Sequence, residues 1–389
     1  MQIQHPLTLL GGISPAEFMR RYWQRKPLLV RQAIPHFKPL VSRTSLFAMA
    51  ADSDVESRLV VGSLQSGTPL SPSKHRKHGL SRPSLTVEQG PFKRSHLPKL
   101  SQREWTLLVQ GVDLHDDAVS DLMHQFRFVP DARLDDVMIS FATDGGGVGP
   151  HFDSYDVFLL QAHGQRTWRI GPQKDLTLVE GVNLKLLANF QPSQEYVLNP
   201  GDMLYLPPRF AHEGVAIGEC MTYSIGFRAP SQNDLAREML LRLSDEGEDT
   251  PSVLYQDPRQ VAVERAGEIP KSLQDFAQKA LDKLLLDPYA TARVLGEYLT
   301  EPKAQVWFKE CHFSQLPKQL RLDRRSRMVY DKHHIFLNGE SWRASGPDAR
   351  LMRRLSDERF LTAAQVLSAS EAAKDLLLTW CNLGWLHQK

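Results

Sequence analysis

Cysteines and long hydrophobic runs are both scarce in this sequence. The 389 residues include three cysteines, Cys220, Cys311 and Cys381, which lie far apart and are odd in number. Such cysteines favour free thiols in a reducing compartment over a disulfide framework. No stretch of about 18 consecutive apolar residues occurs, and the N-terminal residues lack the basic region and apolar stretch of a secretion signal. These absences predict a cytoplasmic protein with no membrane partner.

A large excess of one charge is also absent. Lysine and arginine number 47 against 45 for aspartate and glutamate, a formal net charge of +2. No global electrostatic field therefore draws the protein onto nucleic acid or an anionic membrane, and any basic contact surface must be local. With 41% hydrophobic and 24% charged residues, the composition is that of an ordinary globular protein. The length predicts two or three domains.

The middle of the chain is rich in predicted strands. Between residues 137 and 227, short apolar or alternating runs are separated by glycine and proline. Strands are expected in six of these runs: VMISFA, DVFLLQA, RTWRIG, EYVLN, DMLYLP and MTYSIGF. So many short strands close together indicate an antiparallel barrel or a double-sheet jelly roll.

The segments on either side of these strands have a different pattern. Residues 66–94 are rich in serine, proline, glycine and basic residues, which predicts an exposed loop. After residue 230 the pattern is helical, and KSLQDFAQKALDKLLLD presents one apolar face that needs a partner surface, from another subunit or from the same chain. Near the C-terminus, HHIFLNGESWRA predicts a hairpin with its turn at Asn338-Gly339, between helical segments. This arrangement is typical of a winged-helix-like domain, so the fold class is α+β.

Three potential metal ligands lie around the predicted strands. In GPHFDSYDVFLL, residues i and i+2 of a strand point the same way, so His151 and Asp153 should share one space while Phe152 packs on the opposite face. Downstream, NPGDMLYLPPRFAHEGVAIG places His212 at the start of another strand. Two imidazoles and one carboxylate on one face of an octahedron leave three positions open, the arrangement found in non-haem Fe(II) oxygenases.

Context separates this pair from a second His-x-Asp pair. His115 and Asp117 lie where a loop enters a helix, so we expect acidic residues in a first helical turn there and not metal ligands. The glycines at 145–147 and at 149 precede the ligands, and their lack of side chains would let a substrate chain approach the metal.

At these residues the sequence resembles the JmjC-type, cupin-fold, 2-oxoglutarate-dependent oxygenases, and most closely the bacterial ribosomal oxygenases. The resemblance covers essentially the whole chain and is carried by FMRRYWQRKPLLVRQA, WTLLVQGVD, LDDVMISFATDGGGVGPHFDSYDVFLLQAHGQRTWRIG, PGDMLYLPPRFAHEGVA and YSIGFRAP. It implies a double-stranded β-helix catalytic domain at residues 1–230, a helical dimerisation region at 231–310, a winged-helix-like domain at 311–389, and a homodimer. It also implies that Fe(II), 2-oxoglutarate and O2 are used to hydroxylate an arginine of large-subunit ribosomal protein sixteen.

The resemblance assigns roles to individual residues. His151, Asp153 and His212 are the implied Fe(II) ligands. Arg166 is the implied partner of the distal carboxylate of 2-oxoglutarate, because a guanidinium can form two parallel hydrogen bonds with a carboxylate. Ser140 is implied as a second donor to that carboxylate, although a serine in a strand is often only a packing residue.

Two further residues are candidates for substrate contact. Asp144 could receive the substrate guanidinium, but an aspartate before glycine is equally suited to a turn. Tyr155 shares the parity of the ligands and is expected to line the pocket. Arg209, in LPPRFAHEG, departs from the family pattern, where a small residue is usual, and this leaves the details of the pocket mouth open.

Other functions remain open at this point. A histidine hydroxylase or an N-methyl-lysine demethylase would use the same iron and cosubstrate, although the residues near the ligands are an aspartate and glycines and not an aromatic cage. A non-catalytic ribosome-assembly factor is the alternative from another class. DNA binding is not expected, because the last helical segment, SEAAKDLLLTWCNLGWL, is acidic and apolar.

Overall fold

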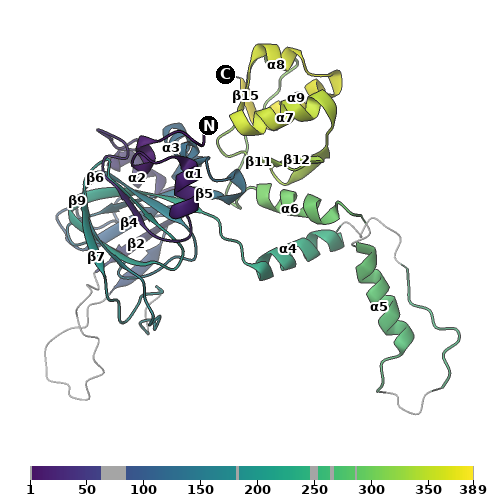
Figure 1. Cartoon of the computed structure of the whole chain (residues 1–389), viewed down its shortest axis with the longest axis horizontal. Coiled ribbons are helices and arrows are strands. Elements are labelled where there is room, and N and C mark those ends of the chain that lie inside the picture. Colours follow the sequence, from purple (N-terminus) through teal and green to yellow (C-terminus); the bar gives the residue numbers. More distant parts are fainter. Residues whose placement is uncertain are drawn as a thin grey trace. The chain divides into compact units, whose positions relative to one another are not determined.

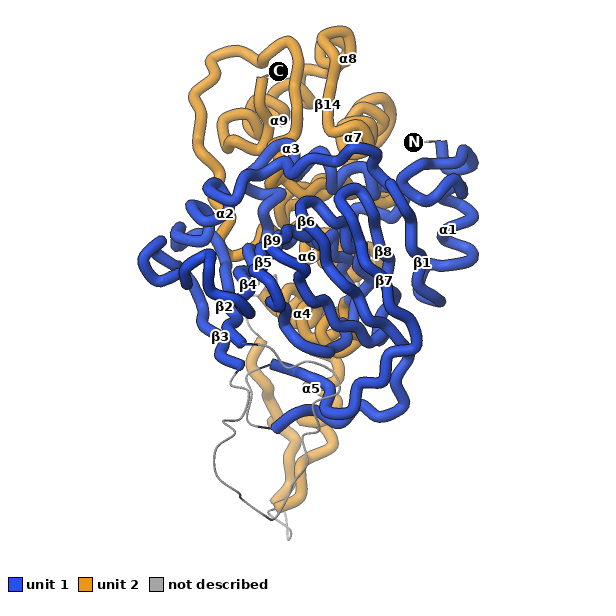
Figure 2. The backbone as a smooth tube through the Cα atoms, turned by 90° about the vertical axis from the view of Figure 1, so that its left-hand side faces the viewer, with its two compact units in different colours: residues 1–229 blue, residues 230–389 orange. Residues whose placement is uncertain are grey.

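The computed structural model describes residues 2–62, 85–180, 184–245, 253–262, 267–284 and 287–388. The chain forms two compact units, residues 1–229 and residues 230–389 (Figure 2). The regions 231–310 and 311–389 fall together in the second unit, and their division into two domains stays a prediction. Within the described residues, no helix is both long and apolar enough to cross a membrane.

The first unit is built on one antiparallel sheet of nine strands. The strand order is β1-β8-β6-β9-β5-β4-β2-β3, with β7 paired to β6. The strands are β1 (Leu28–Val30), β2 (Ser57–Val61), β3 (Thr86–Gln89), β4 (Trp105–Val109), β5 (Leu134–Ala142), β6 (Val157–Gly171), β7 (Gln194–Leu198), β8 (Met203–Leu206) and β9 (Ala211–Phe227). The predicted antiparallel jelly roll and the α+β class are confirmed.

Two predicted boundaries are wrong. The runs DVFLLQA and RTWRIG form the single strand β6, because residues 161–165 bulge against β9 and do not turn away from it. Of the predicted loop at 66–94, residues 66–84 lie outside the described residues, and β3 forms a sheet edge beyond them.

Helices cover one face of this sheet (Figure 1). They are η1 (Thr8–Leu10), α1 (Pro15–Arg21), α2 (Arg43–Met49), η2 (Val112–Leu114), α3 (Asp117–Met123), η3 (His124–Phe126) and η4 (Asp131–Arg133). The ring of Phe18, in α1, lies 5.4 Å from that of Phe158 and 5.0 Å from that of Tyr205. Because neighbouring side chains of a strand alternate, Val157 and Leu159 of β6 face the other way, into a separate apolar cluster with Trp168 and Ile170. This second face is the inside of the jelly roll.

The second unit contains the predicted helices and hairpin. Its elements are α4 (Gln232–Asp245), α5 (Lys271–Leu284), α6 (Ala290–Thr300), β10 (Leu320–Leu322), β11 (Met328–Tyr330), β12 (His334–Leu337), β13 (Glu340–Arg343), α7 (Gly346–Glu358), β14 (Phe360–Leu361), α8 (Ala363–Leu367), α9 (Glu371–Asn382) and β15 (Leu386–Gln388). Asn338 and Gly339 join β12 to β13 with φ angles of 50° and 90°, as a two-residue hairpin turn requires. No residue of α5 is fully buried, although Leu284 packs against the cluster of Leu243, Ala290 and Val294, and the Phe276 ring lies 5.5 Å from that of Tyr255.

Candidate metal centre and cosubstrate pocket

The three predicted metal ligands lie together at the start of β9. The backbone N–H of His151 donates to the carbonyl of His212 at 3.0 Å, and that of His212 donates to the carbonyl of His151 at 2.8 Å. A residue pair that exchanges both hydrogen bonds lies side by side. The two imidazole centroids are accordingly 4.3 Å apart.

The strand that carries His151 and Asp153 is not the one predicted. Regular pairing of β6 begins only at Val157, and the two ligands lie in an extended segment before it. This segment is held by the bridge to His212 and by the N–H of Arg209, which donates to the carbonyl of Asp153 at 2.7 Å. Because the backbone is extended, the predicted i, i+2 alternation still places both side chains on one side, while Phe152 packs with Leu187, Phe190 and Ala211.

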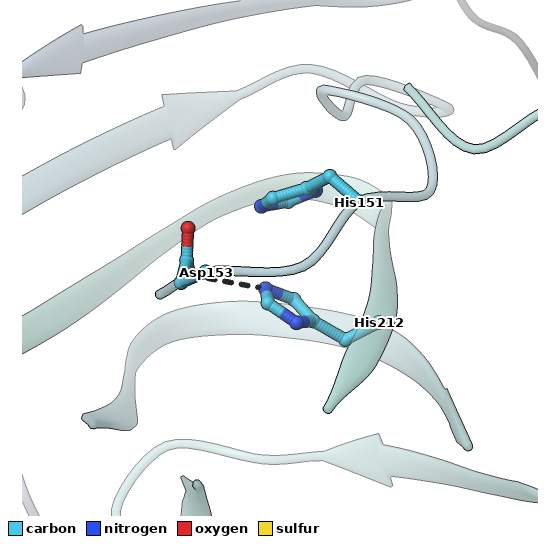
Figure 3. A group of neighbouring side chains, drawn as sticks. All are labelled: His151, Asp153 and His212. Atoms are coloured by element: carbon cyan, nitrogen blue, oxygen red, sulfur yellow. Dashed lines mark ion pairs between the residues drawn. The ribbon is translucent and has the colours of Figure 1, made fainter. Parts of the chain in front are cut away.

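The side chains converge on a common point. One ligand atom from each of His151, Asp153 and His212 lies within 4.8 Å of the others (Figure 3). The Asp153 Oδ2 is 3.6 Å from the His212 Nε2. The Nδ1 atoms of His151 and His212 donate to the carbonyls of Gly149 and Phe210, at 2.9 and 3.0 Å. These hydrogen bonds put the ring proton on Nδ1 and leave the Nε2 lone pair for a metal.

The electrostatic environment favours the ligand form of His212. Burial lowers the pKa of this imidazole well below its usual range, and the neighbouring His151 lowers it further, against the opposing effect of the Asp153 carboxylate. The ring is therefore neutral at pH 7 and carries its one N–H proton on Nδ1. Two such nitrogens and one carboxylate oxygen fit a divalent transition metal. In the part of the chain that the structure describes, no other group of three ligating side chains comes together in this way.

The second His-x-Asp pair, His115 and Asp117, lies where a loop enters a helix, as predicted. His115 ends η2, and Asp117 begins α3, whose N-cap is Asp116. The Asp116 side chain accepts a hydrogen bond from the N–H of Val119 at 3.0 Å.

Residues 144–151 run antiparallel beside the first part of β9. The N–H of Gly145 donates to the carbonyl of Ala216 at 3.0 Å, and the N–H of Ala216 donates to that of Gly146 at 2.9 Å. A Cβ atom on Gly146 would lie 2.5 Å from the Trp105 carbonyl oxygen, and one on Gly147 would lie 2.4 Å from the Gly214 carbonyl oxygen. These two glycines therefore admit neighbouring backbone, and a role of the glycines in the approach of substrate stays a prediction.

Arg166 projects from β6 on the same face as His212. It is opposite Ala216 of β9 and only 5% exposed. Its Nε and Nη2 atoms are buried and have no hydrogen-bond partner among the described residues. Its guanidinium carbon lies 5.7 Å from the Trp168 ring, whose centroid is 5.8 Å from that of His212. Buried guanidinium N–H groups without hydrogen-bond partners are costly, so this position is suited to an anion such as the distal carboxylate of 2-oxoglutarate.

Ser140 belongs to a buried polar row on the inner face of the sheet. It is paired with Thr222 of β9, and Thr222 is paired with Gln161 of β6. The Ser140 hydroxyl donates to the Thr222 carbonyl at 3.5 Å, and the Thr222 hydroxyl donates to the Gln161 Oε1 at 3.0 Å. The sequence reasoning missed Thr222, Gln161 and Trp168. Their alternation within the strand runs was the available signal, but the bulge in β6 breaks it.

The two substrate candidates lie nearer the surface. The Asp144 carboxylate is 44% exposed, accepts the N–H of Gly218 through Oδ1 at 2.9 Å, and pairs through Oδ2 with the Arg103 Nη2 at 2.8 Å. Tyr155 is 40% exposed, in the bend between Asp153 and β6. The substrate roles of both residues stay predictions.

Comparison with known proteins agrees with this geometry. Residues 121–235 match the model of the JmjC domain, and residues 279–387 match that of the ROXA-like winged helix. The chain is 38% identical over 228 residues to the ribosomal protein uL16 3-hydroxylase of Escherichia coli, which covers 56% of this chain and 54% of that protein. It is 27% identical over an alignment of 419 residues to the probable ribosomal oxygenase of Haemophilus influenzae, which covers 96% of both chains. The structure of YcfD, a ribosomal oxygenase from Escherichia coli in complex with cobalt and 2-oxoglutarate, superposes with a TM-score of 0.76 at 27% identity and covers 98% of this chain and 99% of that chain.

The jelly roll, the His-Asp-His cluster and these matches define a JmjC-domain protein of the 2-oxoglutarate-dependent oxygenase class. Enzymes of this class use Fe(II), 2-oxoglutarate and O2, and the cobalt and 2-oxoglutarate bound to YcfD confirm the predicted cofactors. Over nearly its whole length the chain is similar to the bacterial ribosomal oxygenases of the JmjC type. The match to the 3-hydroxylase spans about half of that relative's length.

Proposed function

We propose that the protein hydroxylates an arginine of large-subunit ribosomal protein sixteen. The observation that carries this proposal is the pair of imidazoles whose Nδ1 atoms donate to carbonyls and which lie beside the Asp153 carboxylate, on the same inner face as the buried Arg166. The name of the uL16 3-hydroxylase of Escherichia coli supports the ribosomal substrate.

The proposed ligands are His151, Asp153 and His212, which would hold ferrous iron on one side. When bound, iron, O2 and 2-oxoglutarate supply the oxidising power that inserts oxygen into a C–H bond, with succinate and CO2 as the other products. The protein contributes position and exclusion of water. Arg166 would orient the cosubstrate by pairing with its distal carboxylate, and Ser140 would add a second donor.

The apolar surroundings of Arg166 strengthen this pairing. Leu159, Ile170, Leu198, Leu204 and Leu206 are all buried on the inner face with Trp168. A dry, low-dielectric surrounding makes a cation–carboxylate interaction stronger than it would be in water. It also makes the site costly for Arg166 when no carboxylate is bound, which favours occupation by 2-oxoglutarate.

The position of Asp144 favours arginine over histidine as the target. Asp144 lies at the Gly218 end of the 144–151 segment, whereas His151 lies at the other end, beside His212. A substrate side chain that pairs with the Asp144 carboxylate while its stem extends toward the metal must therefore be long. Arginine has a long aliphatic stem and a guanidinium that pairs with carboxylates, whereas histidine is short.

The decisive experiment incubates the protein with Fe(II), 2-oxoglutarate and isolated ribosomal proteins and then measures intact masses. A gain of one oxygen on protein sixteen, located to an arginine by fragmentation, is the expected result. The same gain on a histidine would identify a histidine hydroxylase, and loss of a methylene group would identify a demethylase. If 2-oxoglutarate were not turned over, the protein would instead be a non-catalytic assembly factor. The His212→Ala variant, which lacks one of the three proposed metal ligands, is the negative control.

The same proposal includes the location of the protein, its oligomeric state and its binding partners. A protein that acts on a ribosomal protein is expected in the cytoplasm, because bacterial ribosomes are assembled there. Leu281 of α5 is 55% exposed, which supports the proposed homodimer and is testable by light scattering. In α9, Leu377, Trp380 and Cys381 are buried in the core of the second unit, so this helix would offer few groups to DNA, and a gel-shift assay tests that.

A further inference from the structure

An arginine of the chain itself occupies the carboxylate proposed for the substrate. The Arg103 Nη2 lies 2.8 Å from the Asp144 Oδ2. The other carboxylate oxygen, Oδ1, is already engaged by the backbone N–H of Gly218 at 2.9 Å. An incoming guanidinium therefore meets a carboxylate whose two oxygens are both already engaged, one of them by the like charge of Arg103.

The backbone keeps Arg103 at this position. The next residue, Glu104, donates its N–H to the carbonyl of Asp144 at 2.9 Å, and its own carbonyl accepts the N–H of Gly62 at 2.7 Å. Glu104 has a φ of 63°, in the left-handed region that costs a non-glycine residue free energy. The Arg103 guanidinium also lies over Gly145, where a Cβ atom would be 3.9 Å from Nη2. The pairing of Arg103 with Asp144 is thus supported by main-chain structure on both sides.

We propose that Arg103 is a specificity-determining residue that competes with the substrate arginine for Asp144. This inference rests on the proposed arginine hydroxylation and deepens it. A substrate cation can replace Arg103, because one guanidinium takes the place of another on the carboxylate. A neutral side chain cannot replace the charge of Arg103, so the Arg103–Asp144 ion pair stays formed. The ion pair therefore favours substrates with a cationic target residue.

The exchange is possible because the pair is exposed. The Arg103 and Asp144 side chains are 70% and 44% exposed, so water and salt screen their attraction. Exposed ion pairs of this kind change an equilibrium by at most about fivefold. Arg103→Gln should accordingly lower the KM for the ribosomal protein about two- to fivefold, with the change in KM and not in kcat, and the gain should shrink at high salt.

A second readout avoids turnover altogether. The dissociation constant of a peptide containing the target arginine is measured with Co(II) and 2-oxoglutarate bound, for the unaltered protein and for Arg103→Gln. The variant should bind the peptide about two- to fivefold more tightly. A peptide with citrulline at the target position carries no charge there and should gain nothing.

Two further variants complete the test. Arg21→Gln is the matched control, because Arg21 is also an exposed arginine paired with a carboxylate, that of Glu17 in α1, and it should leave KM unchanged. In an Asp144→Asn background, Arg103→Gln should have no further effect, because the competition requires the carboxylate.

An Arg103→Gln variant with an unchanged or raised KM, in an enzyme that does hydroxylate arginine, would overturn this inference and leave the proposed function intact. Failure of the unaltered protein to add oxygen to any ribosomal protein would instead overturn the proposed function.

Discussion

Replacing Arg166 by methionine tests the cosubstrate pocket directly. Methionine keeps much of the apolar stem beside Trp168 but removes the charge. In the unaltered protein the Arg166 Nε and Nη2 atoms are buried without partners, so two charge-assisted hydrogen bonds become available to a bound carboxylate. Their loss should cost about 3 kcal/mol, which raises the dissociation constant of 2-oxoglutarate by about two orders of magnitude.

The assay is thermal unfolding with Co(II) in place of iron, with and without 2-oxoglutarate. At about 100 times its dissociation constant, the ligand should stabilise the unaltered protein by about 2.7 kcal/mol and raise the Tm by about 5–10 °C. At the same concentration the Arg166→Met variant should gain only about 1 °C. Without ligand the variant should be at least as stable as the unaltered protein, because a buried unpaired charge has been removed.

Arg169→Met is the matched control from the opposite face of β6. Arg169 pairs with Glu195 at 2.8 Å and with the buried Glu213 at 3.4 Å. This variant should have a lower Tm, because Glu213 loses its ion pair with Arg169, but should keep the full shift with 2-oxoglutarate. If Arg166→Met kept that full shift as well, Arg166 would not be the carboxylate partner.

Three other variants have defined outcomes. Asp144→Asn should raise the KM for the ribosomal protein about two- to fivefold while Co(II) binding, followed by titration, stays normal; an unchanged KM would exclude Asp144 from substrate binding. Gly214→Ala should lower the free energy of unfolding by about 1–3 kcal/mol in urea, because the new Cβ atom would lie 2.7 Å from the Trp168 ring, and an unchanged midpoint would contradict this. Burial alone would raise the pKa of Asp323, but hydrogen bonds from His387 and Arg325 outweigh it and hold the pKa well below its usual range. Its stabilising effect is therefore present above about pH 4 and is lost as the pH falls further, so Asp323→Asn should lower the Tm at pH 7 and differ less from the unaltered protein at pH 3; an equal difference at both pH values would argue against it.

Much of the fold follows from local patterns. The Asn338-Gly339 turn was predictable because both residues tolerate the positive φ angles of a two-residue hairpin. The break in β6 was not predictable in its true form. Residues 161–165 contain Gly164 and look like a turn, but pairing with β9 on both sides keeps them extended and leaves only a bulge.

In the metal centre, too, some features could be predicted from the sequence and others could not. The His151 and Asp153 spacing is local, so their common direction could be read from an extended backbone. The tautomers of His151 and His212 could not, because they depend on the carbonyls of Gly149 and Phe210 lying next to each Nδ1 atom.

By itself, the sequence determined the ligand types, the strand and turn positions, and the side of the chain on which neighbouring residues project. These depend on backbone alternation over a few residues. Only the tertiary structure decided that His212 lies beside His151, that Arg166 is buried with two N–H groups that no described residue accepts, and that Arg103 takes the Asp144 carboxylate. These arrangements depend on segments far apart in the chain, which only the pairing of β9 with β6 and of β4 with β5 brings together.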